Sequence, residues 1–78
     1  MMTLDLTQLK TGQKGIIVEI QGGTGLINRL ESMGIRAGKN VTKISAQLWK
    51  GPQTIKLDNL QIAIGFRMAR KILLKIEK

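Results

Sequence analysis

The chain has 78 residues, a formal net charge of +8, and neither histidine nor cysteine. Without these two residue types it can form no disulfide, no imidazole or thiolate metal site and no Ser-His-Asp or Cys-His catalytic arrangement. The acidic residues stand singly, so a local carboxylate loop for a metal ion is not expected either. They are Asp5, Glu19, Glu31, Asp58 and Glu77. We therefore expect residues 1–78 to form a single non-enzymatic domain without a cofactor or a metal site.

The positive charge predicts an acidic partner. This partner could be a nucleic acid, an anionic membrane face or an acidic protein surface. Most lysines and arginines are dispersed, and this is equally typical of a solvated surface; only residues 66–71 (FRMARK) are clustered. No apolar run is long enough to span a membrane, and residues 1–10 lack the features of a signal peptide. We expect a cytoplasmic protein that reaches the inner membrane only through a partner.

The first predicted elements are a short helical turn and a strand. The turn covers residues 6–15, ends near Gly12 and brings three leucines to one end of a core. These are Leu4, Leu6 and Leu9. Residues 14–21 (KGIIVEIQ) follow with a period of two and many β-branched side chains, which is typical of a half-buried strand. The alternating side chains are Ile16, Val18 and Ile20 on one face and Ile17 and Glu19 on the other.

The pattern then changes to that of a helix over residues 25–34 (GLINRLESMG). Four apolar side chains at helical spacing form one stripe. They are Leu26, Ile27, Leu30 and Met33. We expect Gly34 to end the helix in the left-handed conformation, with Ile35 packing back on Leu30. A helix of about two turns depends on tertiary packing for its stability.

Four further strands are predicted after the helix, over residues 40–49, 53–59, 60–66 and 71–77. In the first of them the apolar residues change phase after Val41, which predicts a β-bulge or a strong bend near Thr42 and places Ile44 in the inward set. Lys50, Gly51 and Pro52 form a turn. Residues 67–69 are a short connector of one 3₁₀ turn. The inward side chains of the last three strands are Ile55, Leu57, Ile62, Ile64, Phe66, Ile72, Leu74 and Ile76.

Five short strands with one short α-helix inserted after the first describe a mainly β fold. Closing such a sheet into a small, strongly bent barrel removes its free edges and lets few residues share one core.

Residues 20–30 (IQGGTGLINRL) look at first like a phosphate-binding loop between a strand and a helix. The P-loop pattern fails because Gly38-Lys39 is followed by Asn40 and begins a strand. A dinucleotide fingerprint fails because Asn28 occupies the position of its last glycine. We interpret Gly22 and Gly23 as a flexible hinge between the strand and the helix, and as a place where a partner contacts the protein.

The order of these motifs resembles the ferrous-iron transport protein A (FeoA) family over nearly the whole chain. The most distinctive segment is RLESMGIRAG, residues 29–38, although Ala37 stands where the family often has proline. The other matching positions are Leu9, Gly12, Gly15, Gly22, Gly23, Gly51, Pro52, Ile62, Ala63, Ile64, Ala69 and Ile72. The resemblance implies an SH3-like β-barrel that serves bacterial ferrous-iron uptake as a small cytosolic accessory, docking on the membrane GTPase-permease FeoB.

Two other interpretations stay open from the sequence. The first is a basic small-barrel nucleic-acid-binding protein, although Trp49 and Phe66 are the only aromatic residues for base stacking. The second is a sensor domain like those of metal-dependent repressors, which would need a separate DNA-binding partner.

The candidates for contacting a partner are Gly22, Gly23, Arg29, Trp49, Lys50, Arg67, Arg70 and Lys71. Trp49, beside Lys50 at a hairpin tip, is either an exposed interface anchor or part of the core. Arg29 bonds either to carbonyls of the loop near Gly22 or to a carboxylate of a partner.

The remaining candidates, at residues 67–71, form either a basic edge or a plain solvated face. Met33 and Met68 are interpreted as core residues rather than as thioether ligands of a soft metal.

Overall fold

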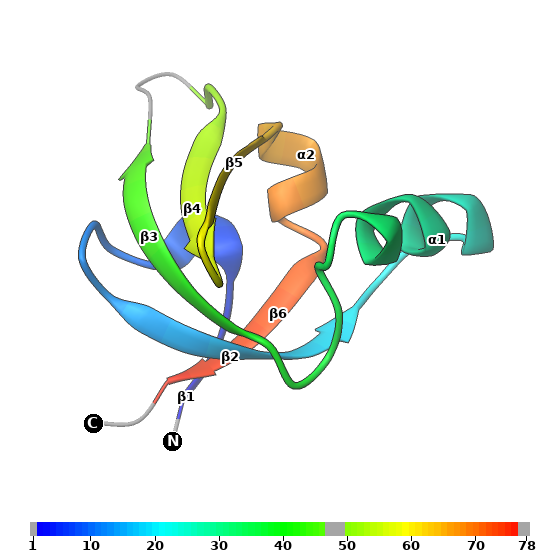
Figure 1. The fold of residues 1–78 in the computed structure, drawn as a ribbon, viewed down its shortest axis with the longest axis horizontal. Helices are drawn as coiled ribbons and strands as arrows, with labels where there is room; N and C mark the ends of the chain where they lie inside the picture. Colours follow the sequence, from blue (N-terminus) through cyan, green and yellow to red (C-terminus); the bar gives the residue numbers. More distant parts are fainter. Residues whose placement is uncertain (1, 47–49, 77–78) are drawn as a thin grey trace.

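A curved antiparallel sheet carries the fold of residues 2–46 and 50–76, which are the residues that the computed structural model describes. In this part of the chain the sheet has six strands, in the order β1-β6-β2-β3-β4-β5. The strands are β1 (Met2–Asp5), β2 (Lys14–Ile20), β3 (Asn40–Ala46), β4 (Gln53–Leu57), β5 (Leu60–Ile64) and β6 (Ile72–Ile76). The helical segments are the 3₁₀ turn η1 (Leu6–Gln8), α1 (Thr24–Ser32) and α2 (Phe66–Ala69) (Figure 1). No helix in these residues is long and apolar enough to cross a membrane.

The mainly β prediction is confirmed, with six strands among the described residues rather than about five. The additional strand is β1, which pairs antiparallel with β6 so that Leu4 lies opposite Leu74. Four residues are too short for a clear alternation, and β1 forms because β6 supplies the hydrogen-bonding partners. The α-helix α1 therefore follows the second strand and not the first. Residues 66–69, expected in part as strand and in part as connector, form the one-turn helix α2.

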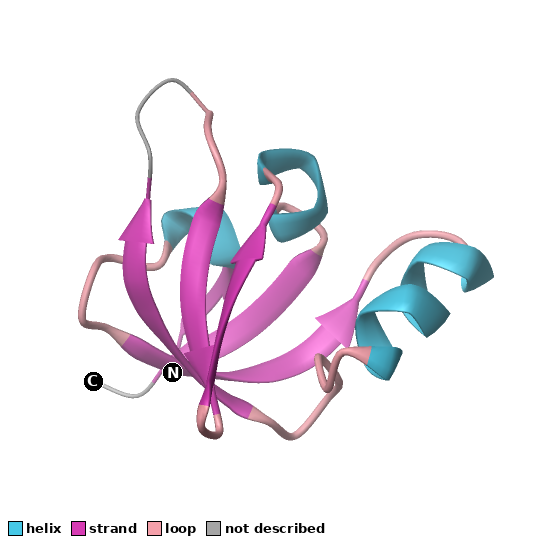
Figure 2. Ribbon diagram, turned by 45° about the horizontal axis from the view of Figure 1, so that its top comes forward, coloured by secondary structure: helices cyan, strands magenta, loops and turns pink. Residues whose placement is uncertain are grey.

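The sheet curls around the core, and short helices cover one of its ends. Figure 2 shows η1 and α2 at the same end of the curved sheet, with α1 outside it beside the end of β2. The segments η1 and α2 contact one another. Leu6 and Leu9, in and after η1, are buried, so the predicted leucine cover of the core is confirmed.

The core consists of inward side chains from all parts of the sheet. Among the predicted inward residues, six of the last three strands and one on α1 are almost completely buried. They are Ile55, Leu57, Ile64, Ile72, Leu74, Ile76 and Leu30. In β2 the buried side chain is Ile17, whereas Ile16 is 41% exposed and Val18 is 37% exposed. The pairing of β2 with β6 shifts between Ile17 and Glu19, so Val18 occupies a bulge and the simple alternation of β2 ends there.

The bulge predicted near Thr42 is present in β3 and lies between Lys43 and Ser45. In this register Val41 and Lys43 are buried, while Ile44 is only partly buried. The inward assignment of Ile44 was therefore wrong, and a lysine that is 1% exposed stands in its place.

Buried polar contacts hold the Lys43 side chain. Its Nζ donates to the carbonyl oxygen of Leu9 at 2.7 Å and to Oε1 of Gln53 at 2.6 Å. Gln53 is also buried, and its Nε2 donates to the carbonyl oxygen of Gly51 at 3.2 Å. The ammonium group thus joins the segment after η1 to the start of β4. Such bonds are required because a buried polar group without a partner costs free energy.

Helix α1 ends as the sequence predicts. Gly34 has a φ of +89°, its N–H donates to Glu31, and the N–H of Ile35 donates to Leu30, both at 3.0 Å. These two bonds form a Schellman motif. Leu30 and Ile35 are fully buried in the same core cluster, as expected. Met33 is 37% exposed, so its interpretation as a core residue was wrong; Met68 does pack against the core.

We expect the Gly34→Ala substitution to destabilise the protein by about 1–2 kcal/mol, because alanine is strained at this φ. A Cβ at this position would also stand 3.1 Å from Cδ2 of Leu57. The matched control is Gly25→Ala in α1, where a Cβ meets nothing within 4 Å. That variant should gain roughly 0.5 kcal/mol from helix propensity. Urea unfolding measures both, and equal effects would show that the helix end does not need a glycine.

Candidate partner-binding site

A basic groove lies where β2 ends and β6 begins. A hollow of about 470 Å³ is lined by Gln21, Arg67, Arg70 and Lys71. The N–H of Gln21 donates to the carbonyl oxygen of Lys71 at 2.8 Å, so the two sides of the groove are joined by the backbone. Three of the four lining side chains are cationic and none is acidic, which concentrates positive potential in one concave place.

The two arginines of the basic groove come from the one-turn helix α2, which contains Arg67, and from its C-cap residue, Arg70. Arg67 and Arg70 are three positions apart and lie on neighbouring sides of the turn. Ala69 is completely buried and Met68 packs against the core, so the arginines are left on the exposed side. The core contacts of α2 therefore determine that both guanidinium groups face solvent.

The glycine loop adjoins this groove. Gly22 has a φ of +126°, and a Cβ there would stand 2.8 Å from Cδ2 of Leu26 and 3.6 Å from Cδ of Lys71. The backbone conformation therefore favours glycine at position 22, and a larger residue would also have to displace the end of the Leu26 side chain. Gly23 is the N-cap residue of α1 and offers no side chain for capping. The predicted hinge thus lies directly beside a cation of the groove.

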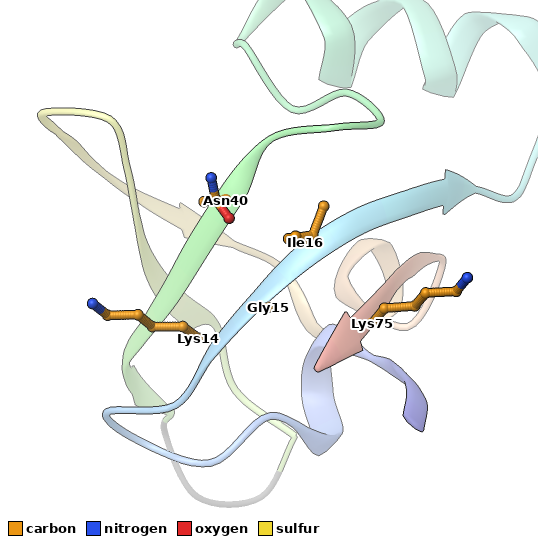
Figure 3. Close-up of a pocket in the computed structure, with 5 residues that line it drawn as sticks. All are labelled: Lys14, Gly15, Ile16, Asn40 and Lys75. Carbon is orange, nitrogen blue, oxygen red and sulfur yellow. The ribbon is translucent and has the colours of Figure 1, made fainter. Parts of the chain in front are cut away.

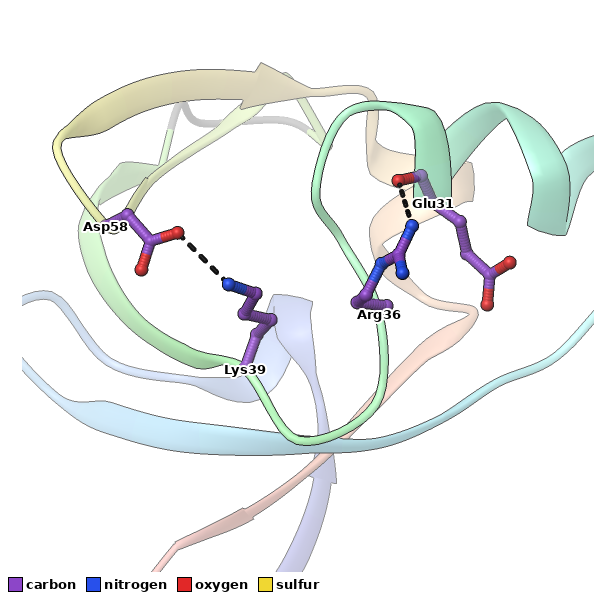
Figure 4. Close-up of polar contacts among 4 residues, drawn as sticks. All are labelled: Glu31, Arg36, Lys39 and Asp58. Atoms are coloured by element: carbon purple, nitrogen blue, oxygen red, sulfur yellow. Dashed lines mark hydrogen bonds and ion pairs between the residues drawn. The ribbon is translucent and has the colours of Figure 1, made fainter.

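The other predicted contact residues lie outside the groove. Arg29 is exposed on α1, and no hydrogen bond joins its side chain to the glycine loop in the described residues. The arginine that does bond to a backbone carbonyl is Arg36, whose Nη2 donates to Glu31 at 3.2 Å (Figure 4). Lys50 is exposed and has a φ of 63°, and Trp49 lies outside the described residues.

The cations of the basic groove form no salt bridge within residues 2–46 and 50–76. The salt bridge of these residues lies elsewhere and joins Lys39, in the segment after α1, to Asp58, in the β4–β5 turn, at 3.3 Å (Figure 4). In the same residues no group of three acidic side chains comes together to hold a metal ion.

A second hollow, which the sequence analysis did not predict, lies on the outer face of the sheet. We call it the sheet-face hollow; it measures about 200 Å³ (Figure 3). Its lining residues are Lys14, Gly15, Ile16, Asn40 and Lys75. They come from β2, β3 and β6, so the sequence brings them together only through the strand register.

The FeoA domain pattern matches residues 4–76, which is almost the entire chain. The chain belongs to the FeoA family. A relative from Methanocaldococcus jannaschii, named "Putative Fe(2+) transport protein A", is 38% identical over 66 residues, covering 85% of this chain and 78% of the relative. A protein of the same name from Campylobacter jejuni is 40% identical over 69 residues, covering 88% of this chain and 93% of its own length.

The crystal structure of an iron uptake regulatory protein (FeoA) superimposes on this FeoA-family chain with a TM-score of 0.86. The two chains are 29% identical, and the match covers 96% of this chain and 97% of the other. The predicted FeoA resemblance and the SH3-like fold are thereby confirmed. Membership connects the chain with Fe(2+) transport and with a family of accessory proteins that are not catalysts.

Proposed function

We propose that this FeoA-family protein is a small cytosolic accessory of ferrous-iron uptake that docks on a FeoB-like membrane GTPase-permease. The observation that carries the proposal is the family match over residues 4–76. The protein acts through contact with the transporter, as a regulatory or supporting module, and it is peripheral at the membrane through that contact.

The basic groove and the adjoining glycine loop form the proposed docking surface. Arg67, Arg70 and Lys71 line one hollow, and none of its lining residues is acidic. A guanidinium group binds a carboxylate through two parallel hydrogen bonds, so this surface fits an acidic patch on the transporter's cytosolic part. Gly22 and Gly23 allow the backbone of the loop to come close to such a partner.

The positive charge of the basic groove favours docking of an acidic protein surface over binding of iron in the groove. Three cations around one hollow repel Fe(2+), because like charges in a concave site with low-dielectric walls raise each other's energy.

Charge reversal in the groove tests the proposal. We expect the Arg67→Glu/Arg70→Glu variant to weaken binding to the purified cytosolic part of the cognate FeoB by about tenfold or more, since attraction becomes repulsion. The matched control is Lys10→Glu/Arg36→Glu, which makes the same change of charge at exposed residues outside the hollows. The affinity of both variants for the immobilised cytosolic part of FeoB is measured at two salt concentrations.

A genetic experiment accompanies the binding measurement. A deletion strain should take up less Fe(2+), and the wild-type gene should restore uptake while the groove variant does not. Absence of binding to FeoB, together with normal uptake in the deletion strain, would overturn the proposed function. Equal loss of binding in the groove variant and its control would remove the groove as the docking surface.

A further inference from the structure

Two rows of side chains, all exposed except the half-buried Thr42, cross the outer face of the sheet. Residues directly opposite one another in adjacent strands project from the same face. Register pairs Thr3 with Lys75, Lys75 with Ile16, and Ile16 with Asn40, which gives a row across β1, β6, β2 and β3. The neighbouring row, two residues away along β2, consists of Lys14, Thr42, Lys56 and Gln61.

The sheet-face hollow lies between these two rows. Figure 3 shows Ile16 and Asn40 between Lys14 and Lys75, whose side chains extend in opposite directions. Ile16 is 41% exposed, although the buried residue of β2 beside it, Ile17, already supplies the core contact. The apolar side chain of Ile16 therefore lies at the centre of a concave, cationic surface and does not contribute to the core.

The hollow continues into a second one on the same face. This second hollow is lined by Lys14, Asn40, Thr42, Lys56 and Asp58. The carboxylate of Asp58 is already engaged by Lys39 at 3.3 Å. Both hollows share Lys14 and Asn40, so together they form one extended surface with three lysines around an apolar centre.

We propose that the sheet-face hollow is a second docking surface, which binds an extended acidic segment of a partner protein carrying one apolar side chain. The apolar side chain of the partner contacts Ile16 above the backbone of Gly15. Acidic residues two positions away on either side lie about 7 Å from it, within reach of the long side chains of Lys14 and Lys75. Asn40 supplies an amide that can donate to and accept from the partner's backbone.

A protein segment fits this surface better than a nucleic acid. Single-stranded nucleic acids bind to basic surfaces that also offer aromatic side chains for stacking. The residues lining the two hollows include an isoleucine but no aromatic residue. Apolar contact at the centre with charged contacts around it is the arrangement of protein interfaces.

The inference is tested with a labelled peptide of sequence Glu-Glu-Leu-Glu-Glu, titrated into the full-length protein and followed by amide NMR. We expect shifts at Gly15, Ile16, Asn40 and Lys75. The Lys14→Glu/Lys75→Glu variant should weaken binding by about tenfold, and Ile16→Ser by roughly threefold. Lys10→Glu/Arg36→Glu, with the same change of charge at exposed residues outside the hollows, should change the affinity by less than about twofold.

Three comparisons decide the outcome. Weaker binding of Glu-Glu-Ser-Glu-Glu and of Gln-Gln-Leu-Gln-Gln than of the first peptide supports the proposal, because both the apolar and the acidic contacts are then needed. Shifts confined to the basic groove, equal losses in the two charge variants, or no binding would overturn it. Tighter, Ile16-independent binding of an oligouridylate at the same amides would overturn it in favour of a nucleic acid. None of these results depends on whether FeoB binds the basic groove.

Discussion

Replacing Lys43 by methionine is expected to destabilise the protein by about 3 kcal/mol. The substitution retains most of the buried volume of the side chain but removes the donor that serves the Leu9 carbonyl and Gln53 Oε1. Lys43 is 1% exposed and Gln53 is 3% exposed, so water cannot replace the lost bonds without opening the structure. Urea unfolding followed by circular dichroism gives the free energy of unfolding for comparison with the wild type.

A second variant distinguishes lost hydrogen bonds from lost packing. In Lys43→Met/Gln53→Leu both members of the buried pair become apolar, so the Gln53 amide no longer stays buried without its partner. We expect this double variant to be about 1–2 kcal/mol more stable than the sum of the two single effects predicts. Strict additivity would mean that Lys43 contributes only by filling space.

Stability should also depend on pH through Lys43. Burial lowers the pKa of its amine below the ordinary value, and the charge of Asp5 opposes this shift. Between the lowered pKa of the folded state and the unfolded value of about 10.4, the unfolded chain binds more protons than the folded protein. The free energy of unfolding of the wild type therefore rises relative to that of Lys43→Met as the pH increases through this interval. The neutral amine still has two N–H donors for its two acceptors, so deprotonation breaks neither bond. A difference in unfolding free energy that stays constant up to pH 10 would contradict this mechanism.

The second large effect is expected from Leu30→Ala, which should cost about 3 kcal/mol. Leu30 is the buried residue of α1 and is completely inaccessible to solvent. A helix of nine residues has little stability of its own, so it depends on this contact and on the Schellman motif that follows. The cavity left by alanine removes core contacts and loosens the helix beside the glycine loop.

The matched control is Leu60→Ala, because Leu60 is 59% exposed. The same chemical change there should alter the unfolding free energy by less than about 0.5 kcal/mol. Amide hydrogen exchange should show faster exchange throughout α1 in Leu30→Ala while β3 and β4 stay protected. Similar losses in both leucine variants would indicate that α1 contributes no more to the fold than an exposed strand residue does.

The parts of the fold that local patterns determine could be predicted from the sequence. Helix α1 and its end at Gly34 follow from the spacing of Leu30 and Ile35 around a glycine. The inward residues of β4 and β6 follow from an alternation that no bulge interrupts.

Features that depend on strand register could not be predicted in the same way. The bulge between Lys43 and Ser45 exchanges the side of the sheet on which neighbouring residues lie, and no propensity favours a lysine over Ile44 in a core. Lys43 is stable there only because the carbonyl of Leu9, far away in the sequence, accepts its hydrogen bond.

The candidate surfaces also depend partly on local sequence and partly on strand register. The basic groove was predicted in part, because Arg67, Arg70 and Lys71 are near neighbours in the sequence. Their proximity to Gly22 required the pairing of β2 with β6. The sheet-face hollow combines residues of three strands, so a single sequence contains no local sign of it.

The position of β6 has a consequence for how the chain folds. It is the last strand along the described chain, yet it lies between β1 and β2, and its Leu74 is completely buried. The earlier strands can form hairpins by themselves, but β1 has no place in the sheet until β6 arrives. Contacts of such large sequence separation slow folding and make it cooperative. During synthesis, the curved sheet is therefore completed only after β6 has left the ribosome, and the nascent chain exposes the apolar side of β2 until then.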